Sequence, residues 1–246
     1  MPLDAFHLLA VAIAAFSVGF FKATLGQTIG SLVVPVMVFF WPTRFVFGVI
    51  AIQMWLSDYS AVKFFWKKWD ARLVKLVLPG MFFGLIFGTY LLVQLPEYWL
   101  RKGLGAACLL FAGMQTRREF RKEIPPPRVG PWMGIGIGLA GGTVSTLFHS
   151  GGLILNFYLL SQGLTKVPLV ATVIAIWIFM NPVKLGSYWV GGVVDLTMIL
   201  MGILALPLTV AGTWAGRHVL EWIPQRSYNL SVLGLSALAA ARLLTE

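Results

Sequence analysis

Residues Gly141–Lys166 read GGTVSTLFHSGGLILNFYLLSQGLTK. The stretch interrupts a very apolar region with a cluster of small and polar residues around His149 and Ser150. Ser150 is a good N-cap residue, so a new helix is expected to start there and to end near Leu160. Such a helix would be about 16 Å long, half the thickness of the hydrocarbon core of a bilayer. A short helix interrupted by glycine at membrane depth indicates a transporter binding site, although a polar turn at the membrane surface would give the same pattern.

The rest of the chain is equally apolar. Of its 246 residues, 58% are hydrophobic and 11% are charged. The apolar runs are continuous and do not alternate, which predicts an all-α polytopic membrane protein and not a barrel. The net charge is +10, but its cations lie mostly in short loops, where they set topology, so no nucleic-acid partner is expected. The single Cys108 excludes an internal disulfide or a cysteine-based metal site, and no metal or cofactor is expected.

Ten apolar segments can be distinguished. They cover residues 5–21, 28–41, 45–65, 71–94, 98–116, 131–148, 151–162, 168–190, 195–220 and 227–244. The chain starts MPLDAF, with an acid and no basic region, so the first segment is expected to be a membrane helix and not a cleaved signal peptide. Residues 115–131 are charged and rich in proline. They are expected to form a cytoplasmic linker between a first transmembrane repeat, 1–114, and a second, 132–246.

Each half holds five segments, and the second segment of each half is short. An odd number of segments forces the second half to insert upside down, whether the short pairs span the membrane or re-enter. The prediction is two inverted five-segment repeats with short broken or re-entrant helix pairs. Gly88–Thr89 in the first half matches Gly212–Thr213 in the second. Glycines four residues apart, such as Gly80 and Gly84, allow close helix packing and would permit a homodimer.

Lysine and arginine predict the orientation. One set of loops carries Lys63, Lys67, Lys68, Arg72, Lys75, Arg117, Arg118, Arg121, Lys122, Arg128, Lys166, Arg217 and Arg226. The other set carries only Arg44, Arg101, Lys102 and Arg242. Because positive loops stay inside, the first set is expected in the cytoplasm and both termini outside the cytoplasmic (inner) membrane.

Residues in both halves match the pattern of a known family. In the second half they are Phe148–Gly152, Tyr158–Leu164, Ala171–Thr172, Asn181, Lys184 and Gly212 to Arg217, and in the first half Gly19–Phe20, Lys22, Pro35, Trp69–Asp70, Leu78–Gly80, Gly84 and Gly88–Thr89. With these residues the chain resembles the TauE/SafE family of sulfite and organosulfur anion exporters. Many members carry three consecutive glycines where this chain has Thr28–Ile29–Gly30 and His149–Ser150–Gly151. The resemblance covers nearly the whole chain and implies transport of a small anion.

Two cations fall where lipid is expected. Lys22 lies at the break between the first two segments, and Lys184 lies midway along the eighth. A lysine at a helix centre costs about 2.5–3.5 kcal/mol on insertion scales, so each needs a partner or a wet cavity. We predict that both line an anion site. The alternatives are snorkelling to the surface and, for Lys184, pairing with Asp58, a buried acid that matches Asn181 in the second half.

The starts of the short helices, near Thr28 and Ser150, add positive potential if the pairs dip toward the membrane midplane. The predicted anion-binding residues are therefore Lys22, Gly26, Gln27, Thr28, Gly30, Ser31, His149, Ser150, Gly151, Asn156, Asn181 and Lys184. His149 and Asp58 are also candidates for coupling or for an ion pair, since histidine titrates near neutral pH. The alternative is that these polar residues only hold helices together, with a neutral His149 bonded to a neighbouring helix.

The sequence thus predicts a secondary transporter that moves a small anion, sulfite or an organosulfonate, outward by alternating access. The alternatives are a passive anion channel, a transporter of short carboxylates, a membrane partner of another complex, and an intramembrane enzyme that uses His149 with Ser150 or Asp58. An enzyme is not expected, because few ionisable groups lie at membrane depth and neighbouring residues on a helix point in different directions.

Overall fold

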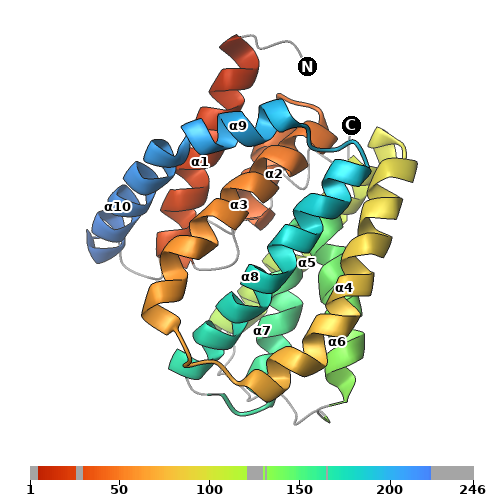
Figure 1. Cartoon of the computed structure of the whole chain (residues 1–246), viewed down its shortest axis with the longest axis vertical. Coiled ribbons are helices and arrows are strands. Elements are labelled where there is room, and N and C mark those ends of the chain that lie inside the picture. The colour runs from red at the N-terminus through yellow and green to blue at the C-terminus, as the bar shows by residue number, and fades with distance from the viewer. Residues whose placement is uncertain (1–4, 26–29, 121–129, 131, 165, 223–246) are drawn as a thin grey trace.

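The computed structural model describes residues 5–25, 30–120, 130, 132–164 and 166–222, and these residues form helices and no strand. The helices are α1 (Ala5–Leu25), α2 (Gly30–Val38), α3 (Thr43–Phe65), α4 (Ala71–Gln94), α5 (Glu97–Phe120), α6 (Met133–Phe148), α7 (Gly151–Ser161), α8 (Lys166–Val190), α9 (Leu196–Leu204) and α10 (Leu206–Trp222), as Figure 1 shows. The predicted all-helical class is confirmed for this part of the chain.

Most of the predicted segments correspond to one helix each. The segment 195–220 does not, because it is bent by 48° between α9 and α10. Pro207 explains the break, since proline lacks an N–H group and clashes with the preceding helical turn. In the first half, α5 continues to Phe120 and so enters the segment 115–131 that was predicted to be a linker. The tenth predicted segment, 227–244, lies outside the described residues.

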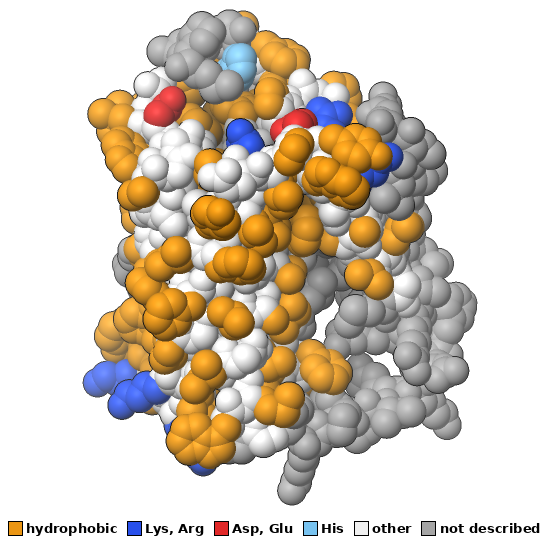
Figure 2. Space-filling model, turned by 90° about the vertical axis from the view of Figure 1, so that its right-hand side faces the viewer, with side chains coloured by type: hydrophobic (Ala, Val, Ile, Leu, Met, Phe, Trp, Pro, Cys, Tyr) orange, Lys and Arg blue, Asp and Glu red, His pale blue; other side chains and the backbone are white. Residues whose placement is uncertain are grey.

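Two helices within the described residues are long and apolar enough to cross a membrane: α4, and Val167–Val190 of α8. The bent pair α9 and α10 makes a third if it counts as one span. A helix of 24 residues is about 36 Å long, more than the roughly 30 Å of a hydrocarbon core. Figure 2 shows apolar side chains over the middle of one face and Lys and Arg side chains near its two ends. These lengths and this surface fit a chain that crosses a membrane more than once.

Glycines let α4 and α6 pack backbone against backbone. A methyl group added at Gly80 or Gly84 would lie 1.8 or 2.2 Å from a carbonyl oxygen of α6. One added at Gly138 or Gly142 would lie 2.3 or 2.5 Å from a carbonyl oxygen of α4. The predicted close packing of small residues is therefore confirmed, but within one chain. The homodimer stays a prediction, and it cannot use this face.

Helices α1 and α10 pack in the same way. Added methyl groups at Gly19, Gly212 and Gly216 would lie 2.1, 2.1 and 2.4 Å from carbonyl oxygens of the opposite helix. In both pairs the helices run parallel, because the contacts advance along both chains together. The first helix of each half thus packs against the fourth segment of the other half.

Helix α8 lies between two hydrophobic cores. One core is formed mainly by α1, α2 and α3, and the other by α4, α7 and α8. Leu185 and Tyr188 of α8 belong to the first core, whereas Ile176 and Met180 belong to the second. In Figure 1, α8 runs alongside α4, and it also contacts α3 and α7. Polar residues in the second half of α8 are therefore held between the cores.

Candidate functional site

Helices α6 and α7 form an antiparallel hairpin. A methyl group at Gly151, the first residue of α7, would lie 2.2 Å from the carbonyl oxygen of Gly141. One at Gly134, near the start of α6, would lie 2.8 Å from the hydroxyl of Tyr158. The chain therefore turns back at His149 and returns to the end at which α6 began. The predicted break and the short helix after it are both present.

The tip of this hairpin is buried but lies off centre. Thr146 lies beside Gly88 of α4, six residues before α4 ends at Gln94. His149 lies three residues beyond Thr146, so the tip is only about 5 Å short of the end of α4. The tip therefore lies near the end of α4, and the depth that it reaches in the membrane stays a prediction.

The backbone at the tip is strained. His149 ends α6 in the left-handed conformation, with φ 54° and ψ 23°, and its N–H donates to the carbonyl of Ser145 at 3.0 Å. Few residues other than glycine adopt this conformation, and they cluster at functional sites.

Ser150 occupies the N-cap position of α7, as predicted, but its side chain makes no capping hydrogen bond. The hydroxyl instead donates to the carbonyl of Phe148 at 3.0 Å. The predicted cap is wrong because α6 leaves this carbonyl free where its last turn ends. The first N–H groups of α7 consequently lack a side-chain cap.

Lys184 of α8 reaches the same turn. Its ammonium donates to the carbonyl of Ser145 at 2.6 Å and lies 3.4 Å from the hydroxyl of that serine. It also lies 5.5 Å from the centroid of the Tyr188 ring. The side chain is 3% exposed, and none of the described carboxylates is within 4 Å of it. The C-terminal end of α6 favours a cation there, but the charge of Lys184 has only neutral partners among these residues.

Asp58 pairs with Asn181 and not with Lys184. The Asn181 amide donates to the Asp58 carboxylate, and both side chains are buried between α3 and α8. The sequence did not predict this contact, and the correspondence of the two positions between the halves stays a prediction. Because Asn181 is three residues before Lys184, both lie on the face of α8 that meets the other helices.

The His149 ring is 2% exposed, and neither of its nitrogens has a hydrogen-bond partner among the described residues. Its centroid lies 5.2 Å from that of Phe47, whose backbone is close to the ring but outside hydrogen-bond geometry. The ring and Lys184 also interact electrostatically. Burying a polar group without a partner lowers the free energy of unfolding by about 1–3 kcal/mol, so the position of the His149 ring destabilises the fold.

The remaining predicted residues divide into two groups. In the second half, Gly151 is buried at the tip and Asn156 is half-buried within α7. In the first half, Gly26, Gln27 and Thr28 lie outside the described residues.

The backbone of the first half differs from the expectation at two points. Lys22 lies within the last turn of α1, which continues to Leu25, and not at the break itself. Gly30 and Ser31 begin α2, two residues later than the predicted start near Thr28. The side chains of Lys22 and Ser31 are outside what the structure describes.

Sequence reasoning missed a second polar contact, at the break between α9 and α10. The amide of Gln53 on α3 donates to the carbonyl of Gly202 at 3.2 Å. The carbonyl oxygen of the same side chain accepts from the hydroxyl of Thr209 at 2.9 Å. The signal in the sequence for this contact was Gln53 itself, a glutamine inside an apolar segment. The segment that it contacts contains Pro207.

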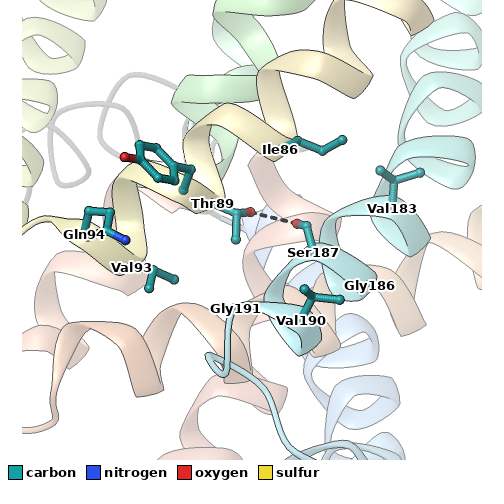
Figure 3. A pocket seen from close by; sticks show the side chains of 10 residues that line it. Ile86, Thr89, Val93, Gln94, Val183, Gly186, Ser187, Val190 and Gly191 are labelled. Atoms are coloured by element: carbon teal, nitrogen blue, oxygen red, sulfur yellow. Dashed lines mark hydrogen bonds between the residues drawn. The ribbon is translucent and has the colours of Figure 1, made fainter.

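A groove between α4 and α8 was also missed. Its volume is about 510 Å³. Figure 3 shows apolar side chains such as Ile86, Val93 and Val190 along it. At its floor the hydroxyls of Thr89 and Ser187 lie 2.7 Å apart and bridge the two helices. The spacing of these residues in the sequence gives no sign of this contact.

A helix hairpin beside a buried cation, within a bundle of apolar helices, is an arrangement typical of membrane transporters. Comparison with protein families agrees. The model of the family described as sulfite exporter TauE/SafE matches residues 11–243, and the chain belongs to this family. The resemblance seen in the sequence is thus confirmed, and the protein is a multi-pass membrane protein of a family that transports sulfur-containing anions. Comparison with curated proteins and with solved structures gave no match.

Proposed function

We propose that the protein exports sulfite or an organosulfonate and that the anion binds at the tip of the α6–α7 hairpin, beside Lys184. The observation that carries this proposal is the ammonium of Lys184, which is 3% exposed and donates only to Ser145 among the described residues. A buried charge is costly unless it is paired. A bound anion would supply the missing negative charge.

Three further groups at the tip suit an anion. The first N–H groups of α7 have no side-chain cap and form the positive end of a helix dipole. The ring nitrogens of His149 lack a partner among the described residues. Third, the backbone at Ser150 and Gly151 is close to the same point, because Gly151 packs against Ser145, which accepts from Lys184. Asn181, which donates to Asp58, lies one turn along α8 from Lys184. His149 and Asp58 are the candidates for coupling transport to a second ion.

The two halves are proposed to be inverted repeats that rock against each other. Support comes from the packing between the halves. Helix α1 of the first half packs on α10 of the second, and α6 of the second half packs on α4 of the first, each through glycines. Under this relation the α1–α2 pair is the counterpart of the α6–α7 pair. It would bring Lys22, Gly26, Gln27, Thr28, Gly30 and Ser31 to a second half-site. Alternating exposure of the anion to the two sides would follow from the rocking.

The orientation proposed here places the start of α4 in the cytoplasm and both termini outside the inner membrane. Lys67, Lys68, Arg72 and Lys75 are exposed at that end of α4. Fewer cations lie at its other end, where Arg44 donates to the carbonyls of Val93 and Leu95. This asymmetry agrees with the rule that positive loops stay inside.

The test is anion counterflow in proteoliposomes loaded with sulfite. Lys184→Gln removes the charge at similar size and is expected to reduce flux by at least a factor of ten, because the anion loses its main partner. Lys22→Ala tests the first half in the same assay. Lys75→Gln, an exposed lysine of α4, is the matched control and is expected to keep wild-type flux. Wild-type flux in Lys184→Gln, with the protein folded, would remove Lys184 from the site.

A further inference from the structure

We propose that the substrates include organosulfonates with an apolar tail, and that the tail lies in the α4–α8 groove while the sulfonate reaches Lys184. This inference rests on the proposed function, because it takes Lys184 as the partner of the anion. It adds a second part to the binding site and names the class of substrate that uses both parts.

The groove has the character needed to hold a hydrocarbon tail. Its walls are mainly apolar, and among the described residues no charged side chain lines its volume of about 510 Å³. It opens at the outer surface of the two helices, where Val190 is 88% exposed. A methyl group added at Gly186 would meet nothing within 4 Å, so this glycine leaves the groove open (Figure 3). Burying each methylene of a tail there would contribute about 0.8 kcal/mol.

The floor of the groove is polar, and it leads toward the buried lysine along α8. Ser187, which bridges to Thr89, also donates to the backbone carbonyl of Lys184 at 2.8 Å. One turn of helix therefore separates the floor from the residue that carries the cation.

A second set of contacts joins the floor to the same lysine through α6. The hydroxyls of Thr89 and Thr146 lie 3.0 and 3.5 Å from the carbonyl of Leu85, and the single proton of Thr89 goes either to this carbonyl or to Ser187. Tyr188 donates to the carbonyl of Thr146 at 2.7 Å, and Ser145, the preceding residue, accepts from Lys184. Polar groups thus lie between the groove and the ammonium, whereas most of the residues that line the groove are apolar. This arrangement complements a molecule with an anionic head and an apolar tail.

The experiment measures binding by the shift in thermal unfolding of the purified chain in lipid nanodiscs. Methanesulfonate, butanesulfonate and octanesulfonate are compared below their micelle concentrations. Wild-type affinity is expected to rise with tail length, by up to about fourfold per buried methylene, which is about 0.8 kcal/mol. Gly186→Leu fills the groove, so it is expected to remove this gain and to leave methanesulfonate binding unchanged. Gly136→Leu is the matched control, since Gly136 of α6 also faces open space but lies outside the groove.

Two outcomes would overturn the inference alone. One is a wild-type affinity that does not depend on tail length; the other is a gain that survives in Gly186→Leu. Octanol, which has the tail without the anion, is expected to give no protection. Equal protection by octanol would assign the groove to membrane lipid and would also overturn the inference. Failure of the proposed function is seen separately, as methanesulfonate binding that is unchanged in Lys184→Gln.

Discussion

The break between α9 and α10 and the break between α6 and α7 differ in how their polar groups are paired. At the break between α9 and α10, Gln53 satisfies the carbonyl of Gly202 and holds the hydroxyl of Thr209. At the tip between α6 and α7, His149 is in a left-handed conformation and its ring nitrogens have no described partner. The first break is closed by the protein itself, whereas the second leaves polar groups available.

This difference indicates what each break does. A break whose backbone is satisfied from a neighbouring helix contributes to stability and gives a bend of 48°. Strain and unpaired buried groups persist only where surrounding structure holds them, and they are typical of binding sites. The sequence indicated the interruption at His149 but not the one beside Pro207, and it showed the partners of neither break, so the function of a break has to be inferred from those partners in the structure.

The largest difference is expected from a methyl group added to the glycine beside each break. Gly151→Ala places a carbon 2.2 Å from the backbone carbonyl of Gly141, so α7 must move away from α6. Gly202→Ala places one 2.4 Å from the γ2 methyl group of Ile52, a side-chain atom that can shift more easily than backbone. Overpacking costs about 1–3 kcal/mol. Gly151→Ala is expected to lie at or above the upper end of that range and Gly202→Ala near the lower end, measured by thermal unfolding in detergent. Equal losses would contradict the comparison.

A smaller effect is expected when the closed break is opened. Gln53→Leu keeps the volume of the side chain but leaves the carbonyl of Gly202 and the hydroxyl of Thr209 without their partner. The free energy of unfolding is expected to fall by about 1–3 kcal/mol, while anion flux per folded molecule stays at the wild-type value. Thr209→Val, which removes one of the two contacts, should cost less. A loss of flux in folded Gln53→Leu would mean that both breaks take part in transport.

The smallest effect on stability is expected at the strained tip. His149→Gly relieves the left-handed backbone, which is worth on the order of 1 kcal/mol, and loses the contact of the ring with Phe47. These changes oppose each other, so unfolding is expected to shift by less than about 1 kcal/mol. Anion flux should fall nonetheless, because a group at the site is removed. Unchanged flux together with a large loss of stability would show that His149 serves packing only.

The sequence predicted those features that depend on local pattern. The glycines of α4 and α6 are spaced so that their close packing could be expected, and the polar cluster at His149 marked a real interruption. The positive φ of His149 is a conformation that glycine adopts without strain, and the sequence showed no sign of it because a histidine stands there.

Other features depend on partners from distant segments, and these were missed. Pro207 lies in an apolar run whose hydropathy hides the break beside it. The bond between Asp58 and Asn181 joins residues 123 positions apart, and it leaves Lys184 without the acid that was considered as its partner. The hydroxyl of Ser150 turns to Phe148 because of where α6 ends, which a capping rule for α7 does not include.

The claim that Lys184 holds the anion at the hairpin tip is tested most directly by binding, independently of transport. The measurement is the rise in the midpoint of thermal unfolding caused by sulfite, in wild type, in Lys184→Gln and in Gln53→Leu as the structural control. We predict a concentration-dependent rise for wild type and Gln53→Leu and none for Lys184→Gln. An equal rise in all three proteins would contradict the assignment of the binding site to this tip.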